Sequence, residues 1–119
     1  LVLGSSTWGA GELQDDWYDG VNVLKKCDLS HKYVALFGCG DSDSYSDTFC
    51  DAIGIIYEDL KDTHCKFCGA VDTAGYTFDS SIAVVDGKFV GLPIDEVNED
   101  NQTEERISAW AEQVKQEIS

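Results

Sequence analysis

Basic residues are scarce in this chain of 119 residues, which has 8 lysines and arginines against 23 aspartates and glutamates and a formal net charge of -15. Nucleic acids and anionic membrane surfaces would repel such a chain, so neither is expected as a partner. A basic protein would instead be attracted to it and steered towards it. The alternative is that the acidity only maintains solubility, and charge alone does not decide between the two.

The chain also lacks long apolar runs. No stretch has the length that spans a membrane, and no signal-peptide pattern opens the chain. Apolar residues still make up 43% of the sequence, enough for one packed domain over residues 1–119. Five cysteines, an odd number without a secretory signal, indicate reduced thiols and a cytoplasmic protein. Cys65 and Cys68 have the spacing of half a zinc site, but no second pair follows, so we expect no metal.

Proline occurs only once, at Pro93, and the rest of the chain alternates between strand and helix patterns. Short apolar runs at residues 1–4 and 33–37 predict strands that are covered on both faces. Apolar residues at helical spacing predict a helix between these strands and a second helix over residues 49–60. Asp47 or Thr48 is the expected N-cap of that second helix.

The last part of the sequence departs from this alternation. Residues 66–71 predict a third strand, and the pair Asp86-Gly87 between two β-rich runs predicts a tight hairpin over residues 81–91. A final helix is expected to begin at the N-cap Thr103 and to place Ile107, Trp110, Val114 and Ile118 on one face. The order strand, helix, strand, helix, strand, hairpin, helix predicts an α/β fold in which helices cover a parallel sheet.

Two loops follow the first two predicted strands, at residues 5–13 and 38–47. In an open parallel sheet, ligands bind beyond the carboxyl ends of the strands, where both loops would lie. Each loop combines small residues with one large aromatic residue, Trp8 in the first and Tyr45 in the second. Either ring taken alone would be expected to fold back onto a helix. Their matched positions favour the other interpretation, in which they cover a planar ligand.

Three motifs carry a resemblance to a known family. Residues 6–17 (STWGAGELQDDW) resemble the first flavin-ring loop of the flavodoxins, and residues 37–41 (FGCGD) with 45–49 (YSDTF) and 51–54 (DAIG) resemble the second. The end of the chain is similar to the long-chain class, whose hallmark is a stretch inserted into the last strand. That part of the resemblance rests on residues 87–92 (GKFVGL), Asp95, Asn98, residues 105–107 (ERI) and Trp110.

The resemblance implies a flavodoxin-like, doubly wound parallel sheet of order 2-1-3-4-5. It starts at the family's third strand, so strands 1 and 2, helices 1 and 2 and the phosphate loop are not matched. It further implies a low-potential one-electron carrier that binds FMN, with Trp8 and Tyr45 on the two faces of the flavin ring. The cofactor-binding residues expected from it are Ser6, Thr7, Trp8, Gly9, Ala10, Gly11, Cys39, Gly40, Asp41, Tyr45 and Asp47.

The same resemblance implies an electron-transfer protein and not an enzyme, with basic redox partners such as a flavodoxin reductase. His31 and His64 lie outside both loops and outside any nucleophile motif, which also argues against hydrolysis. A phosphoacceptor receiver domain would need an acidic cluster at a first strand that has no counterpart here. The remaining alternative is a truncated domain that binds proteins without a cofactor. If residues 1–3 form an exposed apolar edge, we expect instability or oligomers and weak FMN binding.

Overall fold

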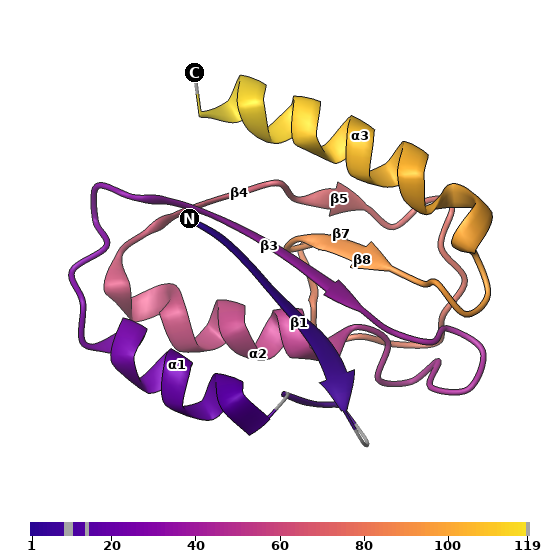
Figure 1. Ribbon diagram of the computed structural model, residues 1–119, viewed down its shortest axis with the longest axis horizontal. Coiled ribbons are helices and arrows are strands. Elements are labelled where there is room, and N and C mark those ends of the chain that lie inside the picture. The colour runs from indigo at the N-terminus through magenta and orange to yellow at the C-terminus, as the bar shows by residue number, and fades with distance from the viewer. Residues whose placement is uncertain (9–10, 14, 119) are drawn as a thin grey trace.

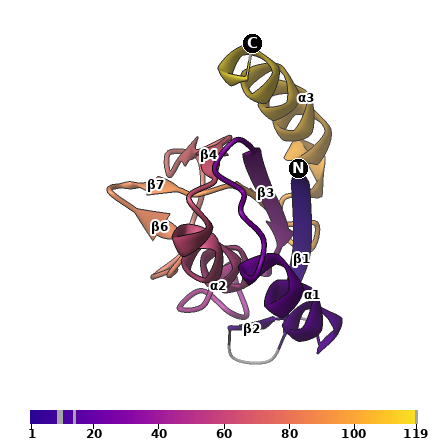
Figure 2. The ribbon, with the colours of Figure 1, turned by 90° about the vertical axis from the view of Figure 1, so that its left-hand side faces the viewer.

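The computed structural model describes residues 1–8, 11–13 and 15–118 (Figures 1 and 2). A mostly parallel sheet separates α1 and α2 on one face from α3 on the other (Figure 1). Both faces are thus covered, as the alternating pattern predicts. In chain order the elements are β1 (Val2–Trp8), β2 (Glu12–Leu13), α1 (Asp15–Lys25), β3 (Tyr33–Cys39), α2 (Asp51–Leu60), the 3-10 turn η1 (Lys61–Thr63), β4 (Lys66–Cys68), β5 (Val71–Asp72), β6 (Val84–Val85), β7 (Lys88–Phe89), β8 (Leu92–Ile94) and α3 (Asp100–Glu117).

Strand β3 is the centre of the sheet. It pairs in parallel with β1 on one edge, and with β4 and then β8 on the other. Strand β4 lies opposite residues 33–35 of β3, and β8 lies opposite residues 37–39. Strands β4 and β8 are therefore two halves of one edge strand, and residues 69–91 are inserted between them. This confirms the predicted insertion into the last strand.

The two faces of β3 belong to different parts of the core. Val34 and Leu36 are fully buried in the cluster that also contains the apolar face of α2. Ala35 and Phe37, which point to the other face, pack in a second cluster with Trp110 of α3. This alternation is why the run over residues 33–37 reads as continuously apolar, since both faces of the strand are covered.

The insertion forms a small antiparallel sheet in the order β5-β7-β6. Asp86 and Gly87 have φ angles of 54° and 82°, so both central residues of the hairpin adopt the left-handed conformation that a tight turn of this kind requires. The hairpin strands are shorter than predicted, because Ser81 and Ile82 donate hydrogen bonds to Phe49 and Asp51 at the start of α2. An aromatic cluster holds the insertion against that helix and consists of Phe49, Tyr76, Phe78 and Phe89.

Both predicted N-caps are wrong. Helix α2 begins at Asp51, and its N-cap is Cys50 in a left-handed conformation, because residues 42–47 form consecutive turns and postpone the helix. Helix α3 begins at Asp100, ahead of Thr103, since a turn in which the Glu99 amide donates to the Asp95 carbonyl already starts the helical path. Side-chain capping is one of several ways to begin a helix, and neither helix uses it here.

The third predicted strand is interrupted, and the first is longer than predicted. Gly69 ends β4 with a φ of 80°, and its carbonyl accepts a hydrogen bond of 2.8 Å from the Trp110 indole. Strand β1 continues to Trp8, because Thr7 and Trp8 pair with β2 in a short hairpin. On the same outer edge, Leu1 and Val2 are more than half exposed, in keeping with the predicted apolar edge.

None of the helices in the described residues is long and apolar enough to cross a bilayer. Within the same residues no cluster of three or more His, Cys, Asp or Glu side chains is arranged to hold a metal ion. The five cysteines are free thiols, and Cys68 of the Cys65–Cys68 pair is buried in the cluster that contains Trp110 of α3.

Substitutions at two helix-interior glycines, one packed against the insertion and one not, report on how tightly the insertion is packed. A Cβ on Gly54 of α2 would lie 2.7 Å from the Ile82 carbonyl group, whereas a Cβ on Gly20 of α1 would find its nearest neighbour at 3.5 Å. We therefore expect Gly54→Ala to lower the free energy of unfolding by about 1–3 kcal/mol, because backbone cannot give way. Gly20→Ala should raise it by up to about 1 kcal/mol through helix propensity. Urea unfolding measures both, and equal effects would contradict the packing described.

Candidate functional site

The candidate site lies where β1 and β3 end side by side. Ser6 pairs with Cys39, so the segments that follow both strands emerge at the same edge of the sheet. A cavity of about 230 Å³ opens there. It is lined by Thr7, Cys39, Gly40, Asp41, Tyr45, Thr48, Cys50 and Val97. The structure thus brings together Thr7, Cys39, Gly40, Asp41 and Tyr45 from the predicted set.

The other predicted residues have different outcomes. Gly9 and Ala10 lie outside the described residues, as do the side chains of Ser6 and Trp8, so the proposed role of the indole stays a prediction. Gly11 has a φ of 86°, and a Cβ there would come within 3.2 Å of the Thr48 Cβ, which brings the first loop against the second. Asp47 is exposed and does not line the cavity, although its carbonyl accepts a hydrogen bond from Ser80.

Tyr45 stands on a series of tight turns at the cavity wall. Its amide donates to the Asp41 carbonyl at 2.9 Å, and its own carbonyl accepts from the Thr48 amide at 3.3 Å. The residue is 51% exposed, so its ring has not folded back into a helix surface. An aromatic side chain that is held by its backbone and left half-exposed beside a cavity is available to cover a flat ligand.

Asp41 is a charged group on the cavity wall. Its Oδ1 accepts hydrogen bonds from the amides of Ser44 at 3.0 Å and Asp43 at 3.1 Å, and from the Asn98 carboxamide at 2.8 Å. These bonds, led by that from Ser44 and the one from Asn98, hold the pKa of Asp41 below its ordinary value. The carboxylate therefore stays ionised at neutral pH and places a negative charge at the cavity.

Asp95 is a fully buried carboxylate that sequence reasoning missed as a functional residue. It accepts hydrogen bonds from the amide of Ser42 at 3.1 Å, from the Ser42 hydroxyl, and from the amide of Asn98 at 3.0 Å. Burial raises the pKa of Asp95, but the bonds from Ser42 and Asn98 outweigh burial and leave the pKa below its ordinary value. The available signal was an aspartate directly after the apolar run of β8.

Thr48 has the one buried side-chain hydroxyl among the described residues that makes no hydrogen bond. It lines the cavity, and leaving such a group unpaired costs about 1–3 kcal/mol. By contrast, the Thr7 hydroxyl accepts a hydrogen bond of 3.2 Å from the Ala52 amide at the start of α2. Thr48 therefore places a buried, unpaired hydroxyl beside the cavity, a feature hidden in the sequence by its expected use as a helix cap.

Cys50 closes the floor of the cavity as a buried thiol. Its φ of 54° turns the chain into α2, and its thiol donates to the Gly38 carbonyl at 3.8 Å. Burial raises the pKa of the Cys50 thiol far above its ordinary value, so the group is neutral. Burial also raises the pKa of Cys39, with a smaller contribution from the charge of Glu96. Neither cysteine is activated as a nucleophile.

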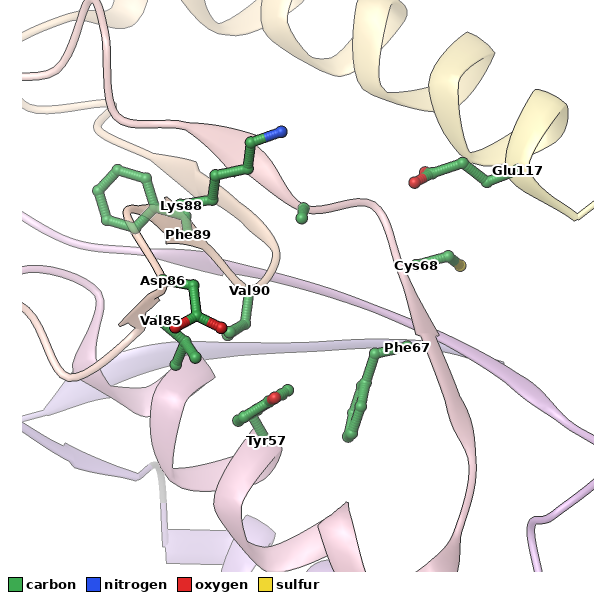
Figure 3. Close-up of a pocket in the computed structure, with 10 residues that line it drawn as sticks. Tyr57, Phe67, Cys68, Val85, Asp86, Lys88, Phe89, Val90 and Glu117 are labelled. Atoms are coloured by element: carbon green, nitrogen blue, oxygen red, sulfur yellow. The ribbon is translucent and has the colours of Figure 1, made fainter.

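A second cavity of about 240 Å³ lies away from these loops, between α2, β4 and the hairpin (Figure 3). The rings of Tyr57 and Phe67 form one wall with centroids 4.5 Å apart. Glu117 reaches the rim from α3, but its carboxylate already accepts the Gly69 amide at 3.0 Å. This cavity contains none of the predicted site residues, and it is the seam along which the insertion meets the sheet.

The buried carboxylate makes a testable contribution to stability. Asp95→Asn would turn a donor towards Ser42, and we expect it to lower the free energy of unfolding by about 3 kcal/mol at neutral pH. Because the folded-state pKa of Asp95 is depressed, its contribution is present above the unfolded-state pKa of about 4 and is lost as the pH falls through the folded-state pKa.

Urea unfolding of both proteins across the acid range measures this difference, which should shrink below about pH 4. Asp72→Asn is the matched control, since Asp72 is exposed and accepts a single amide bond, from Ala74. A stability gap for Asp95→Asn that stayed constant down to strongly acidic pH would show that its charge plays no part.

The sequence of this chain matches a known protein family. The model of the flavodoxin family matches residues 1–110. The chain is 50% identical over 115 residues to the flavodoxin of Helicobacter pylori, covering 97% of this chain and 69% of that protein. It is 44% identical over 120 residues to flavodoxin 1 of Azotobacter vinelandii, covering 99% of this chain and 69% of the relative.

Solved structures agree with the sequence comparison. The flavodoxin of Fusobacterium nucleatum, solved bound to flavin mononucleotide, superposes with a TM-score of 0.93 at 31% identity, over 98% of this chain and 70% of that one. Oxidised flavodoxin 2 of Bacillus cereus superposes with a TM-score of 0.69 at 30% identity, over 98% and 64% of the two chains. The structure adds a split edge strand and two loops that meet at one edge of a parallel sheet. Together with these matches, it shows that the chain belongs to the flavodoxin family.

Proposed function

We propose that this chain is a low-potential one-electron carrier of the long-chain flavodoxin class, which binds FMN at the cavity beyond β1 and β3. The observation that carries the proposal is the convergence of Tyr45, Thr7 and the residue 39–41 segment on one cavity, in a family with FMN-bound members. The division of the edge strand into β4 and β8 by residues 69–91 supports the long-chain class.

The cavity residues fit the ring of FMN. The half-exposed Tyr45 offers an aromatic face, and the unpaired Thr48 hydroxyl offers a hydrogen bond. Gly40 brings backbone to the cavity wall, where a Cβ would lie 2.9 Å from the Cys50 amide nitrogen. None of the residues that line the cavity is a lysine or arginine, so they suit the uncharged ring and not the phosphate.

Each predicted residue has a place in this proposal. Tyr45 covers one face of the ring and Trp8 the other, while the backbones of Gly9 and Ala10 meet one ring edge. The backbones of Cys39, Gly40 and Asp41 meet the pyrimidine edge. Ser6, Thr7, Gly11 and Asp47 complete the two loops that hold these groups.

FMN supplies the one-electron chemistry when it is bound, and the protein sets its energy. Asp41 keeps its negative charge on the cavity wall at neutral pH, because its pKa is lowered by hydrogen bonds. A further negative charge on a ring beside it is repelled, the more strongly where apolar walls reduce the dielectric. The acidic surroundings thus favour release of an electron and a low potential.

The surface charge supports a basic redox partner such as a flavodoxin reductase. We place the protein in the cytoplasm. The formal net charge of -15 would draw a basic protein over tens of ångströms at low salt.

A second candidate function is a protein-binding domain without cofactor. The lack of a cationic residue around the cavity favours it, and titration with FMN separates the two.

Titration with FMN should quench the flavin fluorescence, because a stacked aromatic ring deactivates the excited state. Tyr45→Ala should weaken binding about tenfold, equivalent to about 1.4 kcal/mol of lost stacking. The control is Tyr18→Ala on α1, since Tyr18 is exposed to a similar degree, at 47% against 51%. Unquenched fluorescence at saturating FMN, or equal effects of the two variants, would contradict the assigned site.

Electron transfer from the reduced FMN complex to a basic haem protein should slow as salt is added. Raising the ionic strength from about 10 mM to about 150 mM shortens the Debye length from about 30 Å to about 8 Å and screens the attraction. We expect a fall of about tenfold or more in the second-order rate constant, measured by stopped flow. Ferricyanide is the control, because salt should speed transfer to this anion. Two acceptors with the same salt dependence would refute electrostatic steering.

A further inference from the structure

We propose that Asn98 is a positioning residue that holds the second loop of the site in its ligand-binding form, by bridging the carboxylates of Asp41 and Asp95. The inference rests on the proposed function, because the loop it holds is the one assigned to the flavin ring. We call this arrangement the Asn98 bridge. It joins a residue that follows β3 to a residue that follows β8, two strands that are neighbours in the sheet.

The geometry of the bridge uses both hydrogens of one carboxamide. Asn98 Nδ2 lies 2.8 Å from Asp41 Oδ1 and 3.0 Å from Asp95 Oδ2. A carboxamide nitrogen has two N–H donors, so each carboxylate receives one of them. The Asn98 main-chain amide donates to Asp95 as well, at 3.0 Å, which fixes the side chain relative to its own backbone.

The charges explain why a neutral donor is needed at this position. Asp41 and Asp95 both have a pKa below the ordinary value, so both are ionised and can only accept hydrogen bonds. Without a donor between them they would repel each other. Glu96 and Glu99 lie on the same turn and add negative charge, and Glu99 is neutralised by Arg106 at 3.1 Å. A third carboxylate at position 98 would meet no cation of its own among the described residues.

One side of the bridge is a rigid support. The Glu99 amide binds the Asp95 carbonyl at 2.9 Å, and Arg106 of α3 binds both Glu99 and the Gly75 carbonyl. The guanidinium of Arg106 also lies 4.0 Å from the centre of the Tyr76 ring. Residues 95–99 are thereby attached to the last helix and to the insertion.

The other side of the bridge is the loop that lines the cavity. Residues 42–47 are consecutive turns with no strand or helix of their own, and Tyr45 in their middle is half-exposed. At its start the loop is attached to residues 95–99 by Asp41, which binds Asn98, and by Ser42, which binds Asp95. At its end Ser46 and Asp47 accept hydrogen bonds from the insertion, at Asp79 and Ser80. Asn98 thus connects residues 95–99 and α3 to the start of the loop that carries Tyr45, without touching the ligand itself.

Two isosteric variants and one control test the bridge. Asn98→Leu removes the donors without adding charge, and Asn98→Asp replaces the donors by an acceptor. Glu96→Gln changes the charge of an exposed neighbour on the same turn. The first readout needs no ligand: amide hydrogen exchange of Ser42 and Ser44 in the FMN-free chain, with the core amide of Leu36 as a reference for global unfolding. The second readout is the dissociation constant for FMN.

At neutral pH both Asn98 variants should speed exchange at Ser42 and Ser44 about tenfold relative to Leu36 and weaken FMN binding about tenfold, while Glu96→Gln changes neither. At about pH 5 the Asn98→Asp variant should recover part of its loss in both readouts. The two neighbouring carboxylates raise the pKa of the new aspartate, and its protonated form has one O–H donor, which restores one of the two hydrogen bonds. Asn98→Leu cannot recover, since it has no donor at any pH.

Unchanged exchange at Ser42 and Ser44 in both variants would overturn the bridge, as would the same response of both variants to pH. Failure of the proposed function looks different. If the unmodified chain bound no FMN, the dissociation constants would be lost for every protein in the series, while the exchange measurements would still show whether Asn98 holds the loop.

Discussion

A carboxylate that is removed from water must find its hydrogen-bond donors within the protein, and at Asp95 this requirement decides how three segments meet. The donors come from Ser42 in the loop after β3 and from Asn98 in the turn before α3. Asp95 itself directly follows β8, so the sheet, the site loop and the last helix are joined at one buried group. Apolar packing could bring the same segments together but would leave their relative register loose, because it has no direction.

The fold could be predicted from the sequence where periodicity decides the outcome. Residues 33–37 read as a strand with two buried faces, and in the structure Val34 and Leu36 pack on one face while Ala35 and Phe37 pack on the other. The turn at Asp86-Gly87 was equally readable, because few residue pairs tolerate two positive φ angles in succession. The positions of the two ligand loops then followed from the rule that parallel strands present their carboxyl ends at one edge.

The parts that could not be predicted depend on contacts between residues far apart in the chain. Thr48 looks like a helix cap by its local sequence, yet the turns stabilised by Asp41 delay the helix to Asp51 and leave the Thr48 hydroxyl buried and unpaired beside the cavity. The carboxylate of Asp95 gives no sign of burial in the sequence, since aspartate is usually exposed. Its role depends on Ser42, which is separated from it by 53 positions and approaches only when β8 pairs with β3.

The same negative charge serves two purposes in the proposed carrier, and they act over different distances. Asp41 at the cavity wall influences a bound ring over a few ångströms, a distance shorter than the Debye length, so salt has little effect on it. The remaining excess of acidic residues acts through water on an approaching partner, where salt screens it. Salt should therefore alter the rate of encounter far more than the energy of the bound cofactor. The Asn98 bridge acts over the short distance. It lets the ionised carboxylates of Asp41 and Asp95 remain close to each other, so the charged cavity wall can be part of a well-ordered site.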